Sequence, residues 1–408
     1  MYEEVLRRTH LSAPSDVPLV VAQAAVHLGA TQARLFVVDH EQASLALWAA
    51  DSAADSAAAS VAESPRLPIE GSVHGRVFAA STILELPGEA PGTRRVLLPL
   101  LDGTDRVGVM ELVLGVEGPT EEHLVALCER YAHFVAQLIV TKAAYGDAFE
   151  VKRRTRPMDV SAELMWRLLP PRVFASDDLV VAGLVEPCYA SGGDCFDYAV
   201  NGRIAHLAIF DAMGHGLVAC GASSLAISAY RSARRRGLGL VDTYVEMDLA
   251  VRDQDADRHV TAVIGELDLD DGRLRWVNAG HPEPLLLRHG KVVKTLQAPV
   301  QTPLGIPFDV GPVVEASESL EPGDQLLLYT DGLPEARQPD GEFLTVERLG
   351  EFVERQAAAG YPAPETLRRL RHAVLAHQHG RLQDDASALL LEWRRGTERR
   401  LLPPTVSP

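Results

Sequence analysis

The sequence predicts an α+β protein with a small N-terminal α/β domain, a helical segment and a larger, strand-rich C-terminal domain. The length of 408 residues, at roughly 150 residues per domain, suggests two to three domains. Short strand patterns bounded by Gly, Pro, Asn and Asp recur from 179 to 393, with long helical patterns between them, which favours a layered α+β domain. The composition, 47% hydrophobic and 23% charged, excludes a disordered or fibrous chain.

The charge balance bears on possible partners. A net charge of −17 disfavours non-specific binding to nucleic acid or to an anionic membrane. The first residues, MYEEVLRRTH, lack the apolar core of a signal peptide, so we expect a cytoplasmic protein. Its four cysteines form no CxxC pair, which predicts reduced, buried thiols rather than a zinc site or disulfides.

Residues 1–120 are predicted to form the N-terminal α/β domain. A helix begins at Pro18 and ends at Gly29, after Ser15 and Asp16 as possible caps. Alternation and turn residues predict further elements: a hairpin from 33–39 and 44–50, a short helix in GSVHGRVFAAS, and paired strands at 96–102 and 108–116. The Ala/Ser/Asp stretch 51–62 has little to bury and is expected to be a loop or a frayed helix.

The segment 121–170 is predicted to be a helical linker followed by a switch helix. Apolar residues recur at alternating steps of four and three from Glu121 to Tyr145, as in a heptad seam. The seam is Leu124, Cys128, Tyr131, Val135 and Leu138. We expect it to hold a homodimer, although the run is short and packing against its own domain is the alternative.

A second amphipathic helix follows a basic stretch that ends at Pro157. It runs from Asp159 to Leu169, with Val160, Leu164 and Leu168 on one face. We expect this face to pack on a sheet of the C-terminal domain, so that a shift of the linker rearranges the edge of that sheet; a purely structural cover is the alternative. The strand-rich C-terminal domain then spans 171–396 and a tail 397–408.

The chemistry is predicted in SGGDCFDYAVNGRIAHLAIFDAMGHG, residues 191–216. Asn201-Gly202 between two alternating apolar runs predicts a hairpin, which makes Asp194 and Asp211 diagonal neighbours about 7 to 8 Å apart. Two divalent cations would fit between them, and oxygen ligands favour Mg²⁺ or Mn²⁺. The alternative is that each aspartate only caps a turn or a helix.

More aspartates stand at strand ends further along the chain. Asp331 follows the apolar run LLLYT, and Asp384 and Asp385 precede ASALLL. Such positions can converge at one edge of a layered sheet, although each aspartate alone is more often a turn residue than a ligand.

Six motifs in order carry a family resemblance: GGDCFDY, FDAMGHG, WVNAGHPEPLLL, TPLGI, PGDQLLLYTDGLPEAR and QDDASALLL. Over about residues 160–394 the chain resembles the SpoIIE-type, RsbU-like branch of the PPM (PP2C-like) metal-dependent serine/threonine phosphatases. The resemblance implies a β-sandwich flanked by helices with a site for two Mn²⁺ or Mg²⁺ ions. The metal ligands it implies are Asp194, Asp211, the carbonyl of Ala212, Asp331 and Asp384, with Asp385 as the alternative to Asp384.

The resemblance also implies a substrate and a reaction. The substrate would be a phosphorylated anti-sigma-factor antagonist of the STAS type, hydrolysed without a phosphoenzyme. Asp211 and His215 are the expected catalytic residues, with His215 protonating the leaving serine oxygen; packing at a helix start is the alternative for His215. Asn278 and His281 in NAGHP are expected to shape a turn under the site rather than to react.

The N-terminal domain resembles a GAF sensor domain through LPIEGSVHGRVF and the strands VLLPLLDG and GVMELVL. The sequence does not name its ligand.

The C-terminal domain has two rival functions. A nucleotide cyclase would leave GHG, TDG and DDAS unexplained, whereas a non-catalytic scaffold that keeps the fold remains the alternative to an active phosphatase.

Overall fold

The computed structural model divides into two compact units, Met1–Pro157 with Arg399–Pro408 and Met158–Glu398. It describes residues 7–49, 65–115, 121–190, 192–253, 258–307, 311–336, 344–378, 382, 384–396 and 398–402. The stretch 51–62, expected to be a loop or a frayed helix, lies outside the described residues, as does most of the predicted tail.

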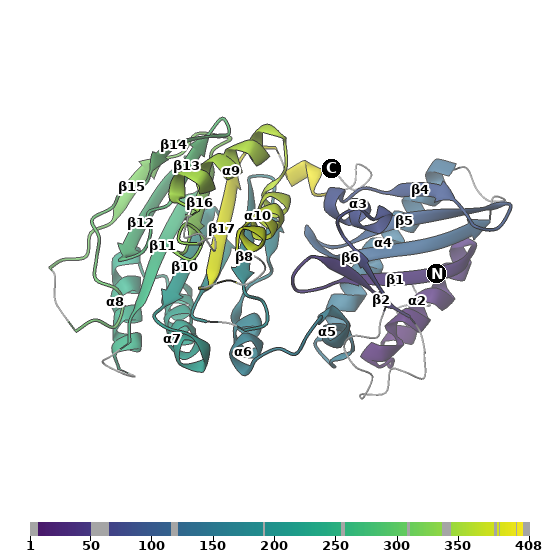
Figure 1. The fold of residues 1–408 in the computed structure, drawn as a ribbon, viewed down its shortest axis with the longest axis horizontal. Helices are drawn as coiled ribbons and strands as arrows, with labels where there is room; N and C mark the ends of the chain where they lie inside the picture. The colour runs from purple at the N-terminus through teal and green to yellow at the C-terminus, as the bar shows by residue number, and fades with distance from the viewer. Residues whose placement is uncertain are drawn as a thin grey trace. The chain divides into compact units, whose positions relative to one another are not determined.

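The first unit contains an antiparallel sheet with strand order β3-β2-β1-β6-β5-β4 (Figure 1). Its strands are β1 (Ala30–Val38), β2 (Ser44–Trp48), β3 (Arg66–Pro68), β4 (Leu84–Pro87), β5 (Thr93–Asp102) and β6 (Asp105–Gly115). Its helices are η1 (Pro14–Asp16), α2 (Val17–Ala25), η2 (Val26–Leu28), α3 (Val73–Ala80), α4 (Glu121–Ala143) and α5 (Ala148–Arg153). Both predicted strand pairs, β1 with β2 and β5 with β6, are confirmed.

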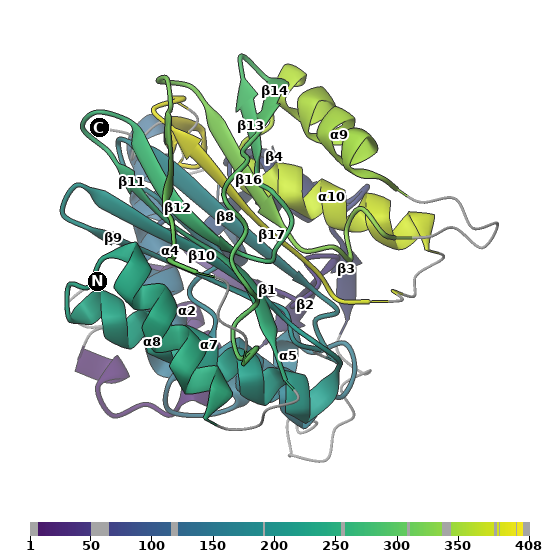
Figure 2. The ribbon, with the colours of Figure 1, turned by 90° about the vertical axis from the view of Figure 1, so that its left-hand side faces the viewer.

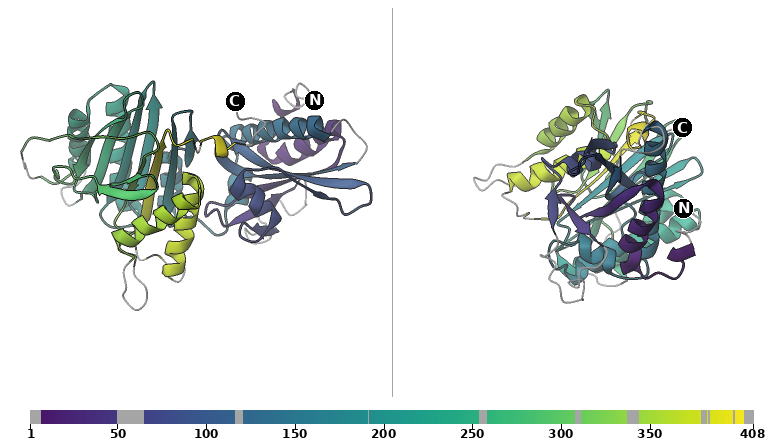
Figure 3. Two further views of the ribbon diagram at one scale, coloured as in Figure 1. Left: turned by 90° about the horizontal axis from the view of Figure 1, so that it is seen from above. Right: turned by 90° about the vertical axis from the view of Figure 1, so that its right-hand side faces the viewer.

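Helices cover both faces of this sheet, with α2 and α4 on one side and α3 on the other (Figure 3). On the α3 side a buried carboxylate, Glu111, lies 2.8 Å from His74 Nε2 and accepts two hydrogen bonds from the Arg95 guanidinium. This polar cluster ties α3 to the two longest strands of the sheet.

The predicted dimer seam of α4 is part of this core. All five seam residues are buried, and Cys128, Tyr131 and Val135 are fully so. The Tyr131 hydroxyl donates to the Val21 carbonyl at 2.6 Å. The expectation of a free dimer face was therefore wrong, because the same heptad spacing packs the helix on its own sheet. α4 is also the one described helix long and apolar enough to cross a membrane, a test that a core helix passes equally well.

The second unit is a sandwich of a five-stranded sheet, order β15-β12-β11-β10-β9, and a six-stranded sheet, order β14-β13-β16-β17-β8-β7. Its strands are β7 (Val173–Ala175), β8 (Leu179–Glu186), β9 (Cys195–Asn201), β10 (Ile204–Ala212), β11 (Val260–Asp268), β12 (Arg273–Ala279), β13 (Leu285–Arg288), β14 (Lys291–Thr295), β15 (Ala316–Ser319), β16 (Gln325–Tyr329) and β17 (Ala386–Trp393). Its helices are α6 (Val160–Leu168), α7 (Gly216–Arg235), α8 (Leu240–Arg252), α9 (Val346–Ala358) and α10 (Ala363–His377), and the short helix η3 (Glu398–Arg400) begins at its last residue.

The sheets face each other across an apolar core, with α7 and α8 over the five-stranded sheet and α9 and α10 over the other (Figure 2). Apolar residues alternate along the strands, and the inward-facing residues of both sheets fill the core between them, which explains why the two sheets stack as layers. β17 is buried along its whole length, because it is a central strand with helices on its outer face.

The face of α6 that packs on the domain differs from the predicted one. Val160 and Leu164 are 67% and 42% exposed, whereas Ser161, Ala162 and Met165 are buried. The small residues let α6 approach α7, where the Cys220 thiol bonds the Ser161 carbonyl. The prediction of which α6 face packs on the domain was thus mostly wrong. The backbones of α6 and α7 approach closely where Ser161 and Ala162 lie, and this leaves Val160 and Leu164 on the exposed side. All four cysteines are free and buried, as expected.

Candidate functional site

The β9–β10 hairpin is present, with a register two residues away from the predicted one. Asn201 pairs with Ile204, so the turn is Gly202-Arg203 and the last pair is Phe210 with Cys195. Gly202 has a positive φ of 60°, as the first central residue of a type II′ turn requires, whereas a type I′ turn would centre on Asn-Gly. Continuing the register by one step sets Asp194 directly opposite Asp211 rather than diagonal to it.

Five aspartates meet at the edge of the sandwich where β10 and β16 end and β9 and β17 begin. We call this set, Asp194, Asp211, Asp331, Asp384 and Asp385, the carboxylate rim. Burial, reinforced by the charges of Asp211 and Asp385, raises the pKa of Asp194 well above its ordinary value. Burial and the charges of Asp331 and Asp384 raise the pKa of Asp211 to about 6. The topology therefore brings the sequence-predicted carboxyl groups together.

Asp194 is held from the other sheet by Thr330. The Thr330 hydroxyl donates to Asp194 Oδ2 at 2.6 Å, and the backbone N–H of Ser387 donates to the same hydroxyl oxygen at 2.9 Å. Thr330 and Ser387 also share a backbone hydrogen bond of 3.0 Å. One buried hydroxyl thus joins the starts or ends of β9, β16 and β17. The sequence analysis missed Thr330, since nothing except its place before Asp331 marks it.

Asp384 and Asp385 have different surroundings. The backbone N–H groups of Gly192, Gly193 and Asp194 bond the Asp385 carboxylate, although burial still raises its pKa to about 7. A Cβ at Gly192 would lie 1.9 Å from Asp385 Oδ2, so only glycine fits there. Asp384 is exposed, and its charge raises the pKa of both Asp211 and Asp331. Asp385 therefore anchors the Gly-Gly loop, while Asp384 faces the other carboxyl groups.

The backbone around Asp211 is shaped by glycines. A Cβ at Gly193 would lie 2.4 Å from the Ala212 carbonyl oxygen, so the glycine lets this carbonyl approach the loop. His215 precedes α7 as its N-cap residue, and its side chain is exposed and makes no cap hydrogen bond. Its ring is therefore not committed to the helix start, which was the alternative to a catalytic role.

Asn278 and His281 shape a buried turn, as expected. The Asn278 side chain donates to the His281 carbonyl and accepts from the His281 N–H, both at 2.8 Å. Burial lowers the pKa of the His281 ring to about 3, so the ring is neutral at physiological pH. Neither side chain reaches solvent, which excludes direct contact with a protein substrate.

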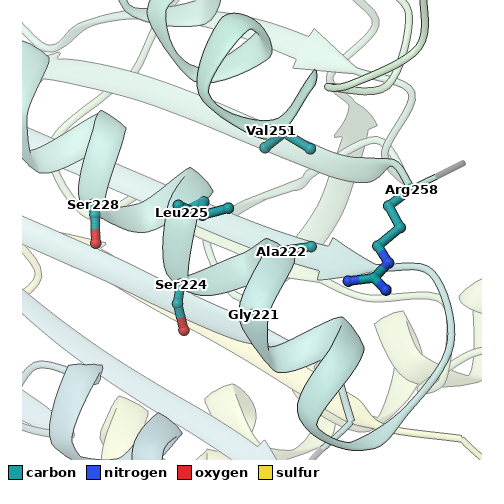
Figure 4. Close-up of a pocket in the computed structure, with 7 residues that line it drawn as sticks. All are labelled: Gly221, Ala222, Ser224, Leu225, Ser228, Val251 and Arg258. Carbon is teal, nitrogen blue, oxygen red and sulfur yellow. The ribbon is translucent and has the colours of Figure 1, made fainter. Parts of the chain in front are cut away.

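A groove of about 390 Å³ lies beside α7 and the end of α8 (Figure 4). It is lined by Gly221, Ala222, Ser224, Leu225, Ser228, Val251 and Arg258. None of the predicted site residues lines it. The groove therefore lies apart from the carboxylate rim.

The rim suits hard divalent cations in its chemistry. Its donors are carboxylate and carbonyl oxygens, which Mg²⁺ and Mn²⁺ prefer. Burial and neighbouring carboxylates raise the pKa values of Asp194, Asp211 and Asp331. No Lys, Arg or His side chain is among the main groups that act on them. Within the described residues, however, no three acidic, Cys or His side chains are grouped so that they could hold an ion as they stand. The donor set thus fits a metal in its chemistry, and the rim side chains would have to move to surround one.

The chain is similar to known proteins over the domain that holds the carboxylate rim. Residues 201–394 match the family described as stage II sporulation protein E (SpoIIE). Phosphoserine phosphatase RsbU of Bacillus subtilis (strain 168) is 23% identical over 276 residues, which cover 65% of this chain and 81% of RsbU. Over residues 201–394 the chain therefore matches the SpoIIE family, and over a longer stretch it is similar to a phosphoserine phosphatase.

Other relatives are similar over shorter stretches. Phosphoserine phosphatase RsbP of the same organism is 29% identical over 147 residues, which cover 35% of this chain and 36% of RsbP. Among solved structures, the SiaA-PP2C domain of Pseudomonas aeruginosa aligns with a TM-score of 0.49 at 20% identity, covering 57% of this chain and 94% of that domain. Four rim positions, Asp211, Asp331, Asp384 and Asp385, lie within the family match, and Asp194 precedes it by seven residues.

Proposed function

We propose that the SpoIIE-family domain hydrolyses phosphoserine or phosphothreonine in a protein, using two Mn²⁺ or Mg²⁺ ions. Asp194, Asp211, the Ala212 carbonyl, Asp331 and Asp384 would hold the ions. The observation that carries the proposal is the carboxylate rim, where acidic groups from four separate segments meet and where burial and neighbouring carboxylates raise the pKa values of Asp194, Asp211 and Asp331. Such crowding is unfavourable without cations, and a perturbed acidic cluster is typical of a functional site.

The two ions would neutralise the phosphoryl oxygens and activate the attacking water. The chain's own residues have distinct parts in the proposal. Asp211 lies between Asp194 and the pair Asp331 and Asp384, as the charges that act on it indicate, so it is our candidate for the shared ligand. Asp385 is assigned to the loop rather than to a metal because three backbone N–H groups already bond it.

His215 is our candidate for the proton donor to the leaving serine oxygen. It lies four residues after Asp211, and its ring is exposed and makes no cap hydrogen bond. A general acid needs such access to a substrate that arrives from solvent. His215→Gln should therefore lower turnover of a protein substrate more than that of a nitrophenyl ester, whose leaving group needs no proton.

The protein substrate we propose is a phosphorylated STAS-domain antagonist of an anti-sigma factor, in the cytoplasm. The support is the motif resemblance and the similarity to RsbU, a protein named as a phosphoserine phosphatase. The N-terminal unit would act as a GAF-like sensor. Its signal would reach the site through α6, whose N-terminal flank and Trp166 side chain bond the backbone of Tyr189 and Cys188, close to the Gly-Gly loop. A homodimer would form through surfaces other than the α4 seam.

The test is phosphatase activity of the full chain with Mn²⁺. Nitrophenyl phosphate turnover that requires Mn²⁺ and stops with EDTA, followed by dephosphorylation of one member of a panel of phosphorylated STAS proteins, would support the proposal. A folded protein that binds STAS partners but hydrolyses neither substrate would favour the scaffold alternative. That alternative has one observation in its favour, since no three His, Cys, Asp or Glu side chains in the described part of the chain are grouped so that they could hold an ion as they stand.

A further inference from the structure

His281 connects the two sheets of the sandwich just beneath the carboxylate rim. Its ring is buried, with Nδ1 2.8 Å from the Thr261 hydroxyl oxygen and Nε2 3.1 Å from the Tyr329 carbonyl oxygen. A carbonyl oxygen can only accept, so Nε2 carries the proton. Nδ1 of the neutral ring then accepts from the Thr261 hydroxyl. Thr261 lies on β11 of one sheet and Tyr329 ends β16 of the other.

Thr261 and Tyr329, the two hydrogen-bond partners of the ring, each lie close to a position that bears an aspartate of the rim. Thr261 is the cross-strand partner of Asp211 in the β10–β11 register. Tyr329 is followed by Thr330, which holds Asp194, and then by Asp331. One imidazole therefore connects β11, the strand paired with the one that carries Asp211, to the end of β16, which Asp331 follows.

The ring has little freedom to move. Asn278 bonds both the N–H and the carbonyl of His281, which fixes the backbone from which the ring projects. Buried polar groups on both sheets depend on the two ring nitrogens, and a buried group left unsatisfied is unfavourable. The ring thus acts as a spacer of fixed length, with a donor at one end and an acceptor at the other.

We propose that His281 is a positioning residue that sets the separation between Asp211 and Asp331 and so tunes the affinity of the rim for divalent cations. This inference rests on the proposed function, because it assumes that the rim binds metal. The ring itself contacts neither metal nor substrate. It acts through Thr261 on one side and through the backbone of Tyr329 on the other.

The test is calorimetric titration of the full chain with Mn²⁺, alongside its melting temperature without metal and its kcat and KM for nitrophenyl phosphate. His281→Phe keeps the ring size and removes both hydrogen bonds. His281→Gln retains an amide N–H that can donate to the Tyr329 carbonyl, and Thr261→Val removes only the hydroxyl. Tyr230→Phe is the matched control, since its buried hydroxyl donates to the Leu207 carbonyl at 3.3 Å, away from the rim.

We expect the Mn²⁺ Kd to rise about tenfold or more in His281→Phe, as when groups supporting metal ligands are removed. It should rise less in Thr261→Val and stay nearest the parent value in His281→Gln. Turnover at saturating Mn²⁺ should recover in part, with KM little changed. The Tyr230→Phe control should melt at a lower temperature but bind Mn²⁺ as the parent does.

Several results would overturn the inference. A folded His281→Phe protein with the parent's Kd would do so, and if that variant does not fold, an unchanged Kd in Thr261→Val would do the same. Equal weakening in Tyr230→Phe would show general destabilisation instead. A parent that binds no Mn²⁺ overturns the proposed function and this inference together, whereas normal binding by the parent and by His281→Phe overturns the inference alone.

Discussion

Replacing Asp211 by Asn should stabilise the metal-free protein while abolishing hydrolysis. The pKa of Asp211 is raised from 3.8 to about 6, first by burial and then by neighbouring carboxylates. Because the folded carboxyl group keeps its proton to higher pH than the unfolded one, stability falls as pH rises from about 4 to about 6, and the penalty is complete above that window. Two pKa units correspond to about 3 kcal/mol.

Part of this penalty is retained by the buried amide, so we expect a gain of about 1 to 3 kcal/mol at pH 7.5. For a domain of this size each kcal/mol raises the melting temperature by about 2 to 4 °C. Mn²⁺ should reverse the order, because an ion at 100 times its Kd stabilises the parent by about 2.7 kcal/mol and the variant much less. Turnover should fall by about a thousandfold, as for the loss of several kcal/mol of metal-dependent stabilisation.

The assay is thermal unfolding in EDTA and in Mn²⁺, with nitrophenyl phosphate turnover at saturating Mn²⁺. Asp177→Asn is the control, since this aspartate is exposed on the same domain and should change neither quantity. Two results would refute the reasoning: an Asp211→Asn protein that melts below the parent in EDTA, or one whose activity stays within tenfold of the parent.

Four further substitutions test other parts of the structure. Leu138→Glu should lower the melting temperature of the N-terminal unit equally at all protein concentrations, because it buries a charge in the core; an effect that fades at high concentration would indicate a dimer face. Leu164→Ala should change stability by less than about 0.5 kcal/mol, and Met165→Ala should lower it by about 2 to 5 kcal/mol, as denaturant unfolding would measure. Glu111→Gln should remove about 3 kcal/mol at pH 7. Burial alone would raise the pKa of Glu111, but its histidine and arginine neighbours lower it to about 2. The parent should therefore lose this stability as pH falls from 4.5 towards 2, while the variant shows a flatter acid limb in pH-dependent melting.

Local patterns were sufficient for most of the secondary structure. Alternating apolar residues between turn residues identified β1, β2, β5 and β6, and the long helical patterns expected between the strands of the C-terminal domain correspond to α7, α8, α9 and α10. Such patterns act over a few residues, so the chain carries them whatever its tertiary environment. The acidic residues of the rim were found in the same way, since turn residues at strand ends stand out against apolar runs.

The sequence could not say which partner each apolar or polar face would meet. The α4 heptads fit a second helix as well as a sheet, and the choice of the sheet follows from how the whole unit folds. For α6, Ser161, Ala162 and Met165 are buried, whereas Val160 and Leu164 are exposed. The β9–β10 register depended on whether the two-residue turn began at Asn201 or at Gly202. These two turns differ in backbone conformation, which composition does not encode.

By itself, therefore, the sequence determined the α+β class, the strand and helix positions and the identity of the acidic residues that form the carboxylate rim. Only the tertiary structure decided that Asp194 stands opposite Asp211, that Asp385 anchors a loop while Asp384 faces the other carboxyl groups, and that Thr330 and His281 link the two sheets. The reason is physical. These roles depend on contacts between strands far apart in the chain, and whether a hydroxyl or an imidazole has a partner there is settled by packing rather than by local spacing.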